Sequence, residues 1–219
     1  MNEPCIALMP SADGRYDGLT MRGVVQVTAD RLLNQVYQVC GNSNIQSARE
    51  DCAHFWLTKT SYDWAVWIDS DIGFSAEDWE LLWSGDDEAV CGTYPRKSQT
   101  RIAMVEWGMG FARVSRKLMQ HIAEMRYEEN GEYLAARYGA YGEERIEYFP
   151  QGARVLEHQS LAEDLGFWTL AKMTGLPVRL ETRLRLLHRG AACWRTPGPG
   201  EHPLTWSKND PSAPDLTER

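Results

Sequence analysis

Trp64-Ala65-Val66-Trp67-Ile68-Asp69-Ser70-Asp71-Ile72-Gly73-Phe74 is a short apolar segment that ends abruptly in two aspartates. Its first five residues are rich in aromatic and β-branched side chains and too few for a helix, which predicts a buried strand. Residues i and i+2 of an extended chain point to the same side, so Asp69 and Asp71 can face one ion. Paired carboxylates repel each other unless a cation lies between them, and oxygen ligands favour Mg²⁺ or Mn²⁺. The alternative is an Asp-rich turn that binds no metal.

The composition is that of a globular protein with a single core. The chain has 219 residues, of which 43% are hydrophobic and 25% are charged, so one domain is expected. No apolar run is long enough to span a bilayer, and the N-terminus lacks a basic region followed by an apolar one, which predicts a cytosolic protein. The five cysteines are scattered without a C-x-x-C pair, which favours free thiols in a reducing compartment. A net charge of −8 argues against broad attraction to nucleic acid but leaves room for a local basic groove.

Strands and helices are predicted to alternate along the first half of the chain. Apolar runs predict strands at 5–10, 36–40, 64–68 and 89–94, and helical spacing predicts helices at 21–35, 45–59 and 76–83, the first capped by Thr20. This order is typical of an α/β domain with a largely parallel sheet. Further along, strands are expected at 101–106, 110–114 and 178–187, and helices at 115–128 and 163–174. The polar segment 129–159 is expected to be an irregular insertion, and 196–219 a loosely ordered, proline-rich tail after a single domain over 1–195.

Five short motifs occur in an order that resembles the GT-A glycosyltransferases, specifically small family-2-like members from bacteria and their phages. They are Asn44-Ile45-Gln46-Ser47-Ala48-Arg49, Trp67-Ile68-Asp69-Ser70-Asp71-Ile72-Gly73-Phe74, Gly92-Thr93-Tyr94-Pro95-Arg96-Lys97, Trp107-Gly108-Met109-Gly110-Phe111 and Glu163-Asp164-Leu165-Gly166-Phe167. The resemblance extends over roughly residues 5–190. The resemblance implies a Rossmann-like α/β fold, with a mixed, mostly parallel sheet flanked by helices. It also implies metal-dependent transfer of a sugar from a nucleotide-sugar donor, with a UDP-sugar as the first expectation, and inversion at the sugar carbon.

The resemblance assigns a metal site to the aspartates and to a late histidine. Asp71 is expected to bind Mn²⁺ or Mg²⁺ directly, and Asp69 to lie nearer the ribose or a metal-bound water. His188 is expected to be a third metal ligand; the alternative is a structural role, which is the commoner one for a lone histidine. The cation would stabilise the negative charge that develops on the leaving diphosphate.

The same resemblance places donor contacts at several positions. The nucleotide-sugar-binding set is Pro10, Ser11, Asn44, Arg49, Ser70, Trp107, Gly108 and Gly110, with Arg96 and Lys97 near the donor phosphates or the acceptor. Arg49 suits phosphate oxygens; the alternative is that it pairs with a neighbouring carboxylate, Glu50 or Asp51. The glycines allow the backbone to approach the sugar, and Trp107 could stack on it or fill the core. The usual acidic residue after the first strand is not obvious, so the nucleotide stays open; Asp13 and Asp17 are candidates.

Glu163 and Asp164 are the candidate catalytic pair. An inverting transfer needs a carboxylate that accepts the proton of the attacking hydroxyl. The resemblance implies that Asp164 is this base and that Glu163 helps to place a substrate. The alternative is two acidic residues in the first turn of a helix, where the macrodipole favours them without any chemistry.

The acceptor cannot be read from the motifs. The insertion and the helix before it interleave arginines with tyrosines, a pattern that can bind nucleic acid: Arg126, Arg137, Arg145, Arg154, Tyr127, Tyr133, Tyr138, Tyr141 and Tyr148. A hydroxymethylated base of phage DNA is therefore one expected acceptor, although glutamates in the segment cancel much of its charge. A protein or a glycan is the alternative. Two rival functions are a nucleotidyltransferase, at which only Asp13-Gly14-Arg15 hints, and a binding module without catalysis.

Overall fold

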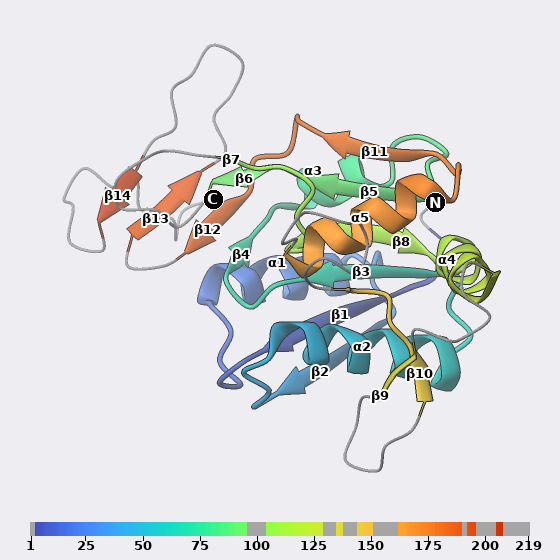
Figure 1. Cartoon of the computed structure of the whole chain (residues 1–219). Coiled ribbons are helices and arrows are strands. Elements are labelled where there is room, and N and C mark those ends of the chain that lie inside the picture. Colours follow the sequence, from blue (N-terminus) through green and yellow to red (C-terminus); the bar gives the residue numbers. More distant parts are fainter. Residues whose placement is uncertain are drawn as a thin grey trace.

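A six-stranded sheet forms the centre of the molecule in the computed structural model, which describes residues 3–95, 104–128, 135–137, 144–150, 162–189, 192–195 and 205–207. Its strands are β1 (Cys5–Ser11), β2 (Gln35–Cys40), β3 (Trp64–Ile68), β5 (Ala89–Gly92), β8 (Phe111–Ser115) and β11 (Val178–Glu181). They lie in the order β11-β5-β8-β3-β1-β2 (Figure 1). All neighbours run parallel except β8, which is antiparallel to both β3 and β5. The predicted fold class, a mixed and mostly parallel sheet flanked by helices, is confirmed.

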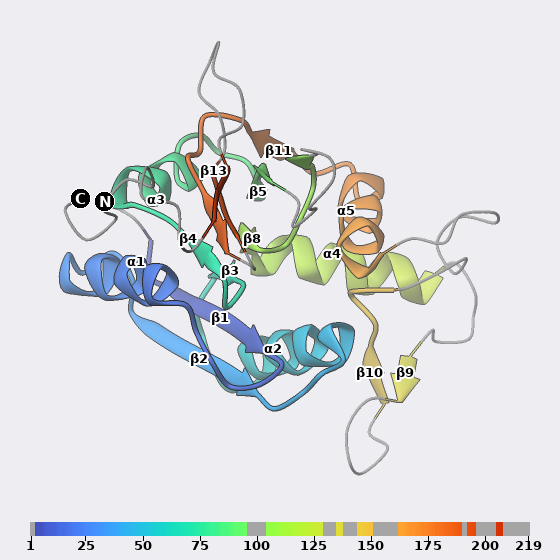
Figure 2. The same cartoon turned by 90° about the vertical axis from the view of Figure 1, so that its left-hand side faces the viewer.

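Helices cover both faces of this sheet (Figure 2). α1 (Gly18–Ala29) and α3 (Ala76–Leu82) pack on one face, and α2 (Ile45–Lys59), α4 (Arg116–Glu128) and α5 (Glu163–Met173) pack on the other. Successive side chains of a strand point to opposite faces, so Ile6 and Leu8 join the α2 side while Ala7 and Met9 join the α1 side. β1 is therefore buried along its whole length, as expected of a strand covered on both faces, whereas the edge strand β2 alternates half-buried and exposed residues. Within the described ranges, every helix is too short or too polar to cross a membrane.

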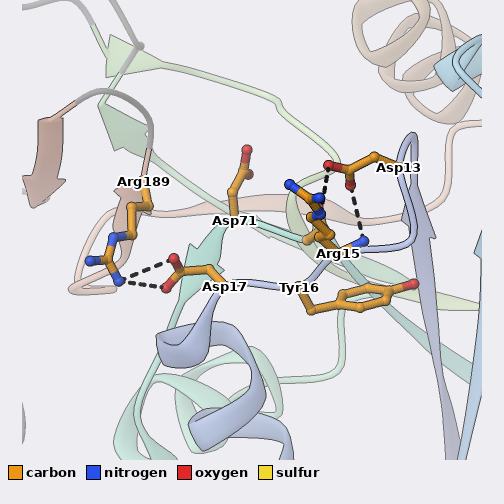
Figure 3. Close-up of a pocket in the computed structure, with 7 residues that line it drawn as sticks. Asp13, Arg15, Tyr16, Asp17, Asp71 and Arg189 are labelled. Atoms are coloured by element: carbon orange, nitrogen blue, oxygen red, sulfur yellow. Dashed lines mark hydrogen bonds and ion pairs between the residues drawn. The ribbon is translucent and has the colours of Figure 1, made fainter.

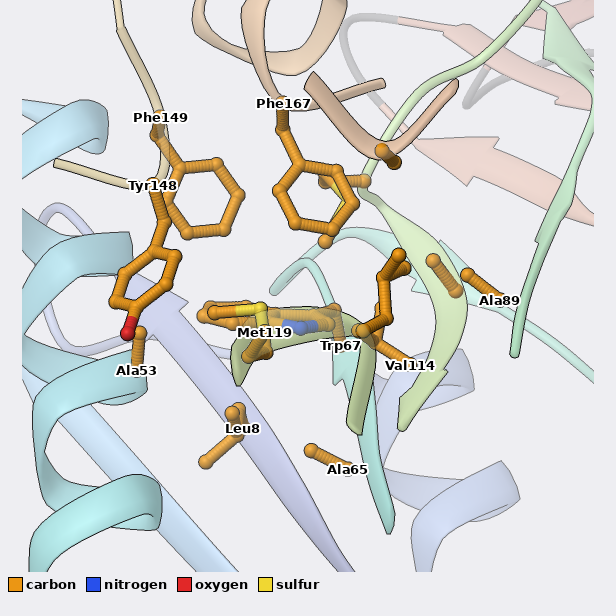
Figure 4. Packing of buried hydrophobic residues seen from close by; sticks show 14 of the residues in the cluster. Leu8, Ala53, Ala65, Trp67, Ala89, Val114, Met119, Tyr148, Phe149 and Phe167 are labelled. Carbon is orange, nitrogen blue, oxygen red and sulfur yellow. The ribbon is translucent and has the colours of Figure 1, made fainter. Parts of the chain in front are cut away.

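Aromatic rings fill the core on the α2 side of the sheet (Figure 4). The ring of Phe149 meets Trp67 edge-on at 5.1 Å and stacks on Phe167 at 5.1 Å. The backbone N–H of Phe149 donates to the buried carboxylate of Glu50 on α2, at 2.7 Å. Tyr148 beside it is also buried, so the expectation that Tyr148 faces an acceptor is wrong.

The insertion predicted over 129–159 is not irregular throughout. β9 (Ala135–Arg137) and β10 (Glu144–Ile146) pair antiparallel, and the chain after β10 joins the core. The other arginines and tyrosines predicted to contact an acceptor lie outside the residues whose side chains the structure describes. Sequence periodicity missed the strand pair because each strand has only three residues.

Several predicted elements have different bounds in the structure, and two differ most: the helix predicted over 21–35, which ends at Ala29, and the strand predicted over 178–187. α1 begins at Gly18 because Asp17 accepts the N–H of Leu19 and caps the helix, whereas Thr20 is buried and donates its hydroxyl to the carbonyl of Ser70. The strand predicted over 178–187 divides into β11 and β12 (Leu187–Arg189), which belong to different sheets. The division follows a turn in which the backbone N–H of Arg183 donates to Glu181.

A second sheet places the late histidine beside the aspartates. It has the order β14-β13-β12-β4, with β4 (Ile72–Gly73), β13 (Ala192–Arg195) and β14 (Thr205–Ser207). β14 lies in the segment predicted to be a loosely ordered tail, and it pairs with β13. β4 follows Asp71 directly and pairs antiparallel with β12, so that Ile72 is opposite His188. The strand predicted over 89–94 divides into β5 and β6 (Tyr94–Pro95), which contacts β12 and β13. β6 pairs antiparallel with β7 (Met104–Val105), the part of the strand predicted over 101–106 that is seen as a strand; residues 101–103 lie outside the described residues.

Candidate functional site

Polar residues from distant parts of the chain meet at the carboxyl edge of the central sheet. Asp69 and Asp71 follow β3, and Tyr94 follows β5, which runs in the same direction. β8 is antiparallel, so the loop that leads into it, Gly108 to Gly110, begins at this same edge. The backbone N–H of Asp69 donates to the carbonyl of Gly110 at 2.9 Å, which joins the two loops. This edge is where open α/β sheets bind ligands.

A buried arginine holds three carboxylates together at this edge. Arg49 on α2 is 2% exposed, and its Nη2 lies 3.2 Å from both carboxylate oxygens of Asp69. Its Nη1 donates to Oε1 of Glu163 at 2.8 Å and also to Oδ1 of Asp164. Burial alone would lower the pKa of Arg49, but the nearby carboxylates of Asp69 and Glu163 raise it above its ordinary value. The guanidinium is therefore a permanent positive charge beneath the site.

This placement differs from the predicted role of Arg49. The sequence suggested a contact with the diphosphate or with Glu50; instead the guanidinium is covered by three carboxylates from β3 and α5. Its Nε is buried and has no hydrogen-bond partner in the described part of the chain. Arg49 thus joins the predicted metal-binding and catalytic carboxylates into one group.

Asp164 is fixed through both of its carboxylate oxygens. Oδ1 is bound to Arg49, and Oδ2 accepts the backbone N–H of Met109 at 3.2 Å. The side chain keeps 21% of its surface exposed, and that of Glu163 keeps 15%. The first turn of α5 therefore lies against the glycine loop, Gly108 to Gly110.

Asp71 and His188 face each other across β4 and β12. Nε2 of His188 lies 3.5 Å from Oδ1 of Asp71, and Nδ1 lies 2.6 Å from the carbonyl oxygen of Pro95. A carbonyl oxygen can only accept, so Nδ1 carries the hydrogen, and in the neutral ring Nε2 presents a lone pair toward Asp71. A ring nitrogen oriented in this way by its second nitrogen is typical of metal-ligating histidines.

The expected trio of metal ligands is only partly assembled. Among the described residues, no group of three or more His, Cys, Asp or Glu side chains is placed to hold a metal ion. Asp71 and His188 supply one oxygen and one nitrogen, a donor set that suits Mn²⁺ and leaves positions for phosphate oxygens. Asp69 faces Arg49 instead.

A pocket of about 300 Å³ opens beside Asp71 (Figure 3). Its lining consists of Asp13, Arg15, Tyr16, Asp17, Ser70, Asp71 and Arg189. Asp17 pairs with Nη1 of Arg189 at 3.1 Å, and Asp13 pairs more loosely with Arg15 at 3.9 Å. Acidic, basic and aromatic side chains are thus combined in one open pocket.

The pocket is lined by the loop that follows β1, and not by the end of β1 itself. Pro10 and Ser11 were expected to line it, but both are buried, and the Ser11 hydroxyl donates to the carbonyl of Arg15 at 2.9 Å. The loop after them lines the pocket, including Asp13 and Asp17, the acidic candidates named from the sequence. Ser70 lines it as well.

Asn44 and Trp107, two further residues predicted to contact the donor, have structural partners within the chain. The side chain of Asn44 caps α2 by accepting the N–H of Ser47 at 3.1 Å. Trp107 packs against Trp168 at 5.5 Å, and the ammonium of Lys172 lies 3.5 Å from its ring centre, so its role in the structure is packing on α5. Arg96 and Lys97 lie outside the described residues.

Sequence reasoning gave no role to Arg189 or Tyr94. Arg189 follows His188 directly. The sequence feature that could have identified it is a basic residue at the end of a strand that also carries a candidate metal ligand. The Tyr94 hydroxyl accepts the N–H of Gly110 at 3.1 Å, and its ring meets His188 edge-on at 5.1 Å. Tyr94 thus supports the glycine loop and the histidine together.

Alanine at Gly108 is expected to displace Tyr94. A Cβ there would lie 2.2 Å from the Tyr94 hydroxyl oxygen, and Tyr94 is only 4% exposed, so the ring has no free space to enter. Overpacking of this kind costs roughly 1–3 kcal/mol. Chemical denaturation should show this loss for Gly108→Ala. Gly18→Ala, where nothing lies within 4 Å, is the control that should stay near wild type.

Solved structures of other proteins align with this fold. The protein A197 from STIV aligns with a TM-score of 0.53 and 14% identity, over 95% of this chain and 95% of that chain. A glycosyltransferase involved in the glycosylation of the major capsid of PBCV-1 aligns with a TM-score of 0.38 and 14% identity, over 58% of this chain and 68% of that chain. No protein-family model and no curated protein sequence matches the chain. The similarity to A197 extends over nearly the whole of both chains and supports the α/β fold alone.

Proposed function

We propose that this chain is a metal-dependent glycosyltransferase that moves a sugar from a nucleotide-sugar donor to an acceptor hydroxyl. The observation that carries the proposal is the facing pair of Asp71 and His188 beside the pocket, with the histidine tautomer set by Pro95. The pair would hold Mn²⁺ or Mg²⁺, which would supply Lewis-acid stabilisation of the leaving diphosphate. The Arg49 cluster lies at the same sheet edge, so donor and acceptor chemistry would be adjacent.

The chain's own groups fit a single displacement. The acceptor oxygen attacks the sugar carbon, the bond from that carbon to the diphosphate oxygen breaks, and the hydroxyl proton passes to Asp164. One displacement of this kind inverts the configuration at the carbon. Arg49 and the N–H of Met109 orient the Asp164 carboxylate for that transfer. The absence of a side chain at Gly108 and Gly110 would allow the donor sugar to approach the backbone closely.

The donor experiment is a screen for metal-dependent hydrolysis. Sugar nucleotides, beginning with UDP-sugars, are incubated with the protein and Mn²⁺ or Mg²⁺, and the released nucleoside diphosphate is measured with and without EDTA. Release that requires the metal supports the proposal. Release that continues unchanged in EDTA contradicts the metal dependence.

The acceptor is tested separately once a donor is known. Hydroxymethylated DNA is the first acceptor proposed, and protein and glycan acceptors follow. Mass spectrometry of the product distinguishes an added sugar from an added nucleotide. The nucleotidyltransferase alternative draws some support from Arg15, which lines the pocket after β1, and an added nucleotide would establish it. Binding of sugar nucleotides without hydrolysis or transfer to any acceptor would indicate a binding module.

Replacing Asp164 with asparagine should separate binding from transfer. The amide keeps the shape of the carboxylate but cannot accept the acceptor proton, so the transfer rate should fall by about 10²- to 10⁴-fold. Donor affinity, measured by calorimetry, should change little, because Asp164 does not line the pocket. Glu163→Gln is the matched control on the same helical turn, and a smaller loss is expected there. An unchanged transfer rate in Asp164→Asn would exclude it as the base.

A further inference from the structure

The pocket beside Asp71 contains an ion pair that the proposed mechanism does not use. Nη1 of Arg189 lies 3.1 Å and 3.2 Å from the two carboxylate oxygens of Asp17, and Figure 3 shows the pair at the pocket wall. We infer that Arg189 binds the diphosphate of the donor, and that Asp17 holds Arg189 in place until the diphosphate replaces it. The identity of the diphosphate as part of a sugar donor rests on the proposed function.

The backbone of Arg189 is fixed to the loop that carries Asp71. Its N–H donates to the carbonyl of Asp71 at 2.9 Å, and the preceding residue, His188, faces the Asp71 carboxylate. Side chains alternate along a strand, so the guanidinium of Arg189 leaves β12 on the opposite side from His188. Both Asp71 and Arg189 line the pocket. A phosphate group bound near Asp71 would therefore lie close to a cation with a rigid backbone.

Arg189 has hydrogen-bond donors to spare. Within the described part of the chain its side chain is bonded only through Nη1, which leaves the Nε and Nη2 groups for another partner. The side chain is 34% exposed, so a ligand can reach it. A guanidinium binds phosphate oxygens through two parallel hydrogen bonds, which are stronger than an exposed ion pair.

Asp17 can lose Arg189 and remain bonded. Its Oδ1 also accepts the N–H of Leu19 at 2.9 Å, as the N-terminal cap of α1. A carboxylate at a helix N-terminus is stabilised by the free N–H groups and by the macrodipole. The exchange of partners therefore leaves no buried charge without a partner, which is what a reversible hold on Arg189 requires.

The charges that line the pocket show why the position of Arg189 matters for binding an anion. Three carboxylates, those of Asp13, Asp17 and Asp71, face two guanidiniums, those of Arg15 and Arg189. The lining carries one more negative than positive charge, so a bare anion is not attracted strongly. Arg15 is 88% exposed and 3.9 Å from Asp13, which makes it the looser of the two cations. Arg189 is the one that the fold holds next to Asp71.

Calorimetry with inorganic pyrophosphate and Mg²⁺, and then with UDP and Mg²⁺, tests the inference on the full chain. Arg189→Ala should weaken the binding of both by about 10- to 100-fold, because a charge-assisted hydrogen-bonded pair is lost. Arg189→Lys should recover part of the affinity. Asp17→Asn keeps the helix cap but releases Arg189, and binding should tighten by about 2- to 5-fold. Arg183→Ala, which removes a largely exposed arginine outside the pocket and leaves its partner Glu181 paired with Arg179, should change binding less than about 2-fold.

A folding defect cannot produce the tighter binding expected of Asp17→Asn, and in the Arg189→Ala background the same change should tighten binding by less, because only a pocket charge is then removed. Wild-type affinity in Arg189→Ala, weaker binding in Asp17→Asn, or no pyrophosphate binding by the wild type would each overturn the inference. Failure of the proposed function gives a different pattern. In that case no sugar nucleotide is hydrolysed, while the binding of pyrophosphate still depends on Arg189. Conversely, donor hydrolysis with an unchanged KM in Arg189→Ala leaves the glycosyltransferase proposal standing and removes this role of Arg189.

Discussion

Replacing Asp71 with asparagine is expected to lower the rate of metal-dependent donor hydrolysis by at least about 100-fold, because removing one preorganised electrostatic stabiliser costs roughly 2.7–4 kcal/mol of transition-state free energy. The amide is nearly isosteric with the carboxylate, so the β4–β12 pairing that begins at the next residue should persist. What is lost is the negative charge that faces Nε2 of His188. The measurement is the rate of nucleoside diphosphate release over a titration of Mn²⁺, which should also show a weaker apparent metal affinity.

The control for this variant lies at the other end of the same strand. Asp63 precedes β3, is exposed, and is separated by the whole strand from the site. Asp63→Asn should therefore hydrolyse the donor at the wild-type rate. Both variants should unfold at nearly the wild-type denaturant concentration. Wild-type hydrolysis by Asp71→Asn would contradict the role of Asp71 as a metal ligand, whatever the behaviour of Asp69.

Local sequence pattern predicted the centre of the fold closely. β3 covers Trp64–Ile68 and α2 covers Ile45–Lys59, the bounds expected from the sequence. Both have strong local signals, an apolar run stopped by aspartates in one case and an asparagine cap in the other. The position of His188 next to Asp71 was also anticipated, although through the resemblance and not through its pairing with β4.

Contacts between distant segments could not be predicted in this way. Arg49 is 114 residues from Glu163 and 115 from Asp164 in the sequence, and no periodicity connects them. Its nearest acidic neighbours in the sequence offered a simpler pairing. The burial of Tyr148 has the same cause, because the segment around it is polar and is held in the core by a hydrogen bond to Glu50 on another element. The pocket residue Arg189 was missed because its partner, Asp17, lies 172 residues away.

Replacing Arg49 with methionine is expected to destabilise the protein by about 3–5 kcal/mol, because it leaves partly buried carboxylates without their cation. Asp69, Glu163 and Asp164 are 24%, 15% and 21% exposed, and in the wild type each is paired with Arg49. The loss is large beside a typical total stability of about 5–15 kcal/mol. For a chain of this length the melting temperature should fall by roughly 6–20 °C. Lys117→Met, which breaks the more exposed pair with Glu88, should cost less than about 1 kcal/mol.

A second substitution tests whether Arg49 stabilises the protein by balancing the charge of the three carboxylates. In the wild-type background, Glu163→Gln removes a partner of Arg49 and should lower the stability. In the Arg49→Met background, the same change removes one of several mutually repelling charges and should raise the stability by roughly 1 kcal/mol. Denaturant unfolding of the four proteins measures both effects. An equal loss in the two backgrounds would mean that Arg49 stabilises the site through its packing, since only a charge-balancing role makes the sign of the Glu163→Gln effect depend on Arg49.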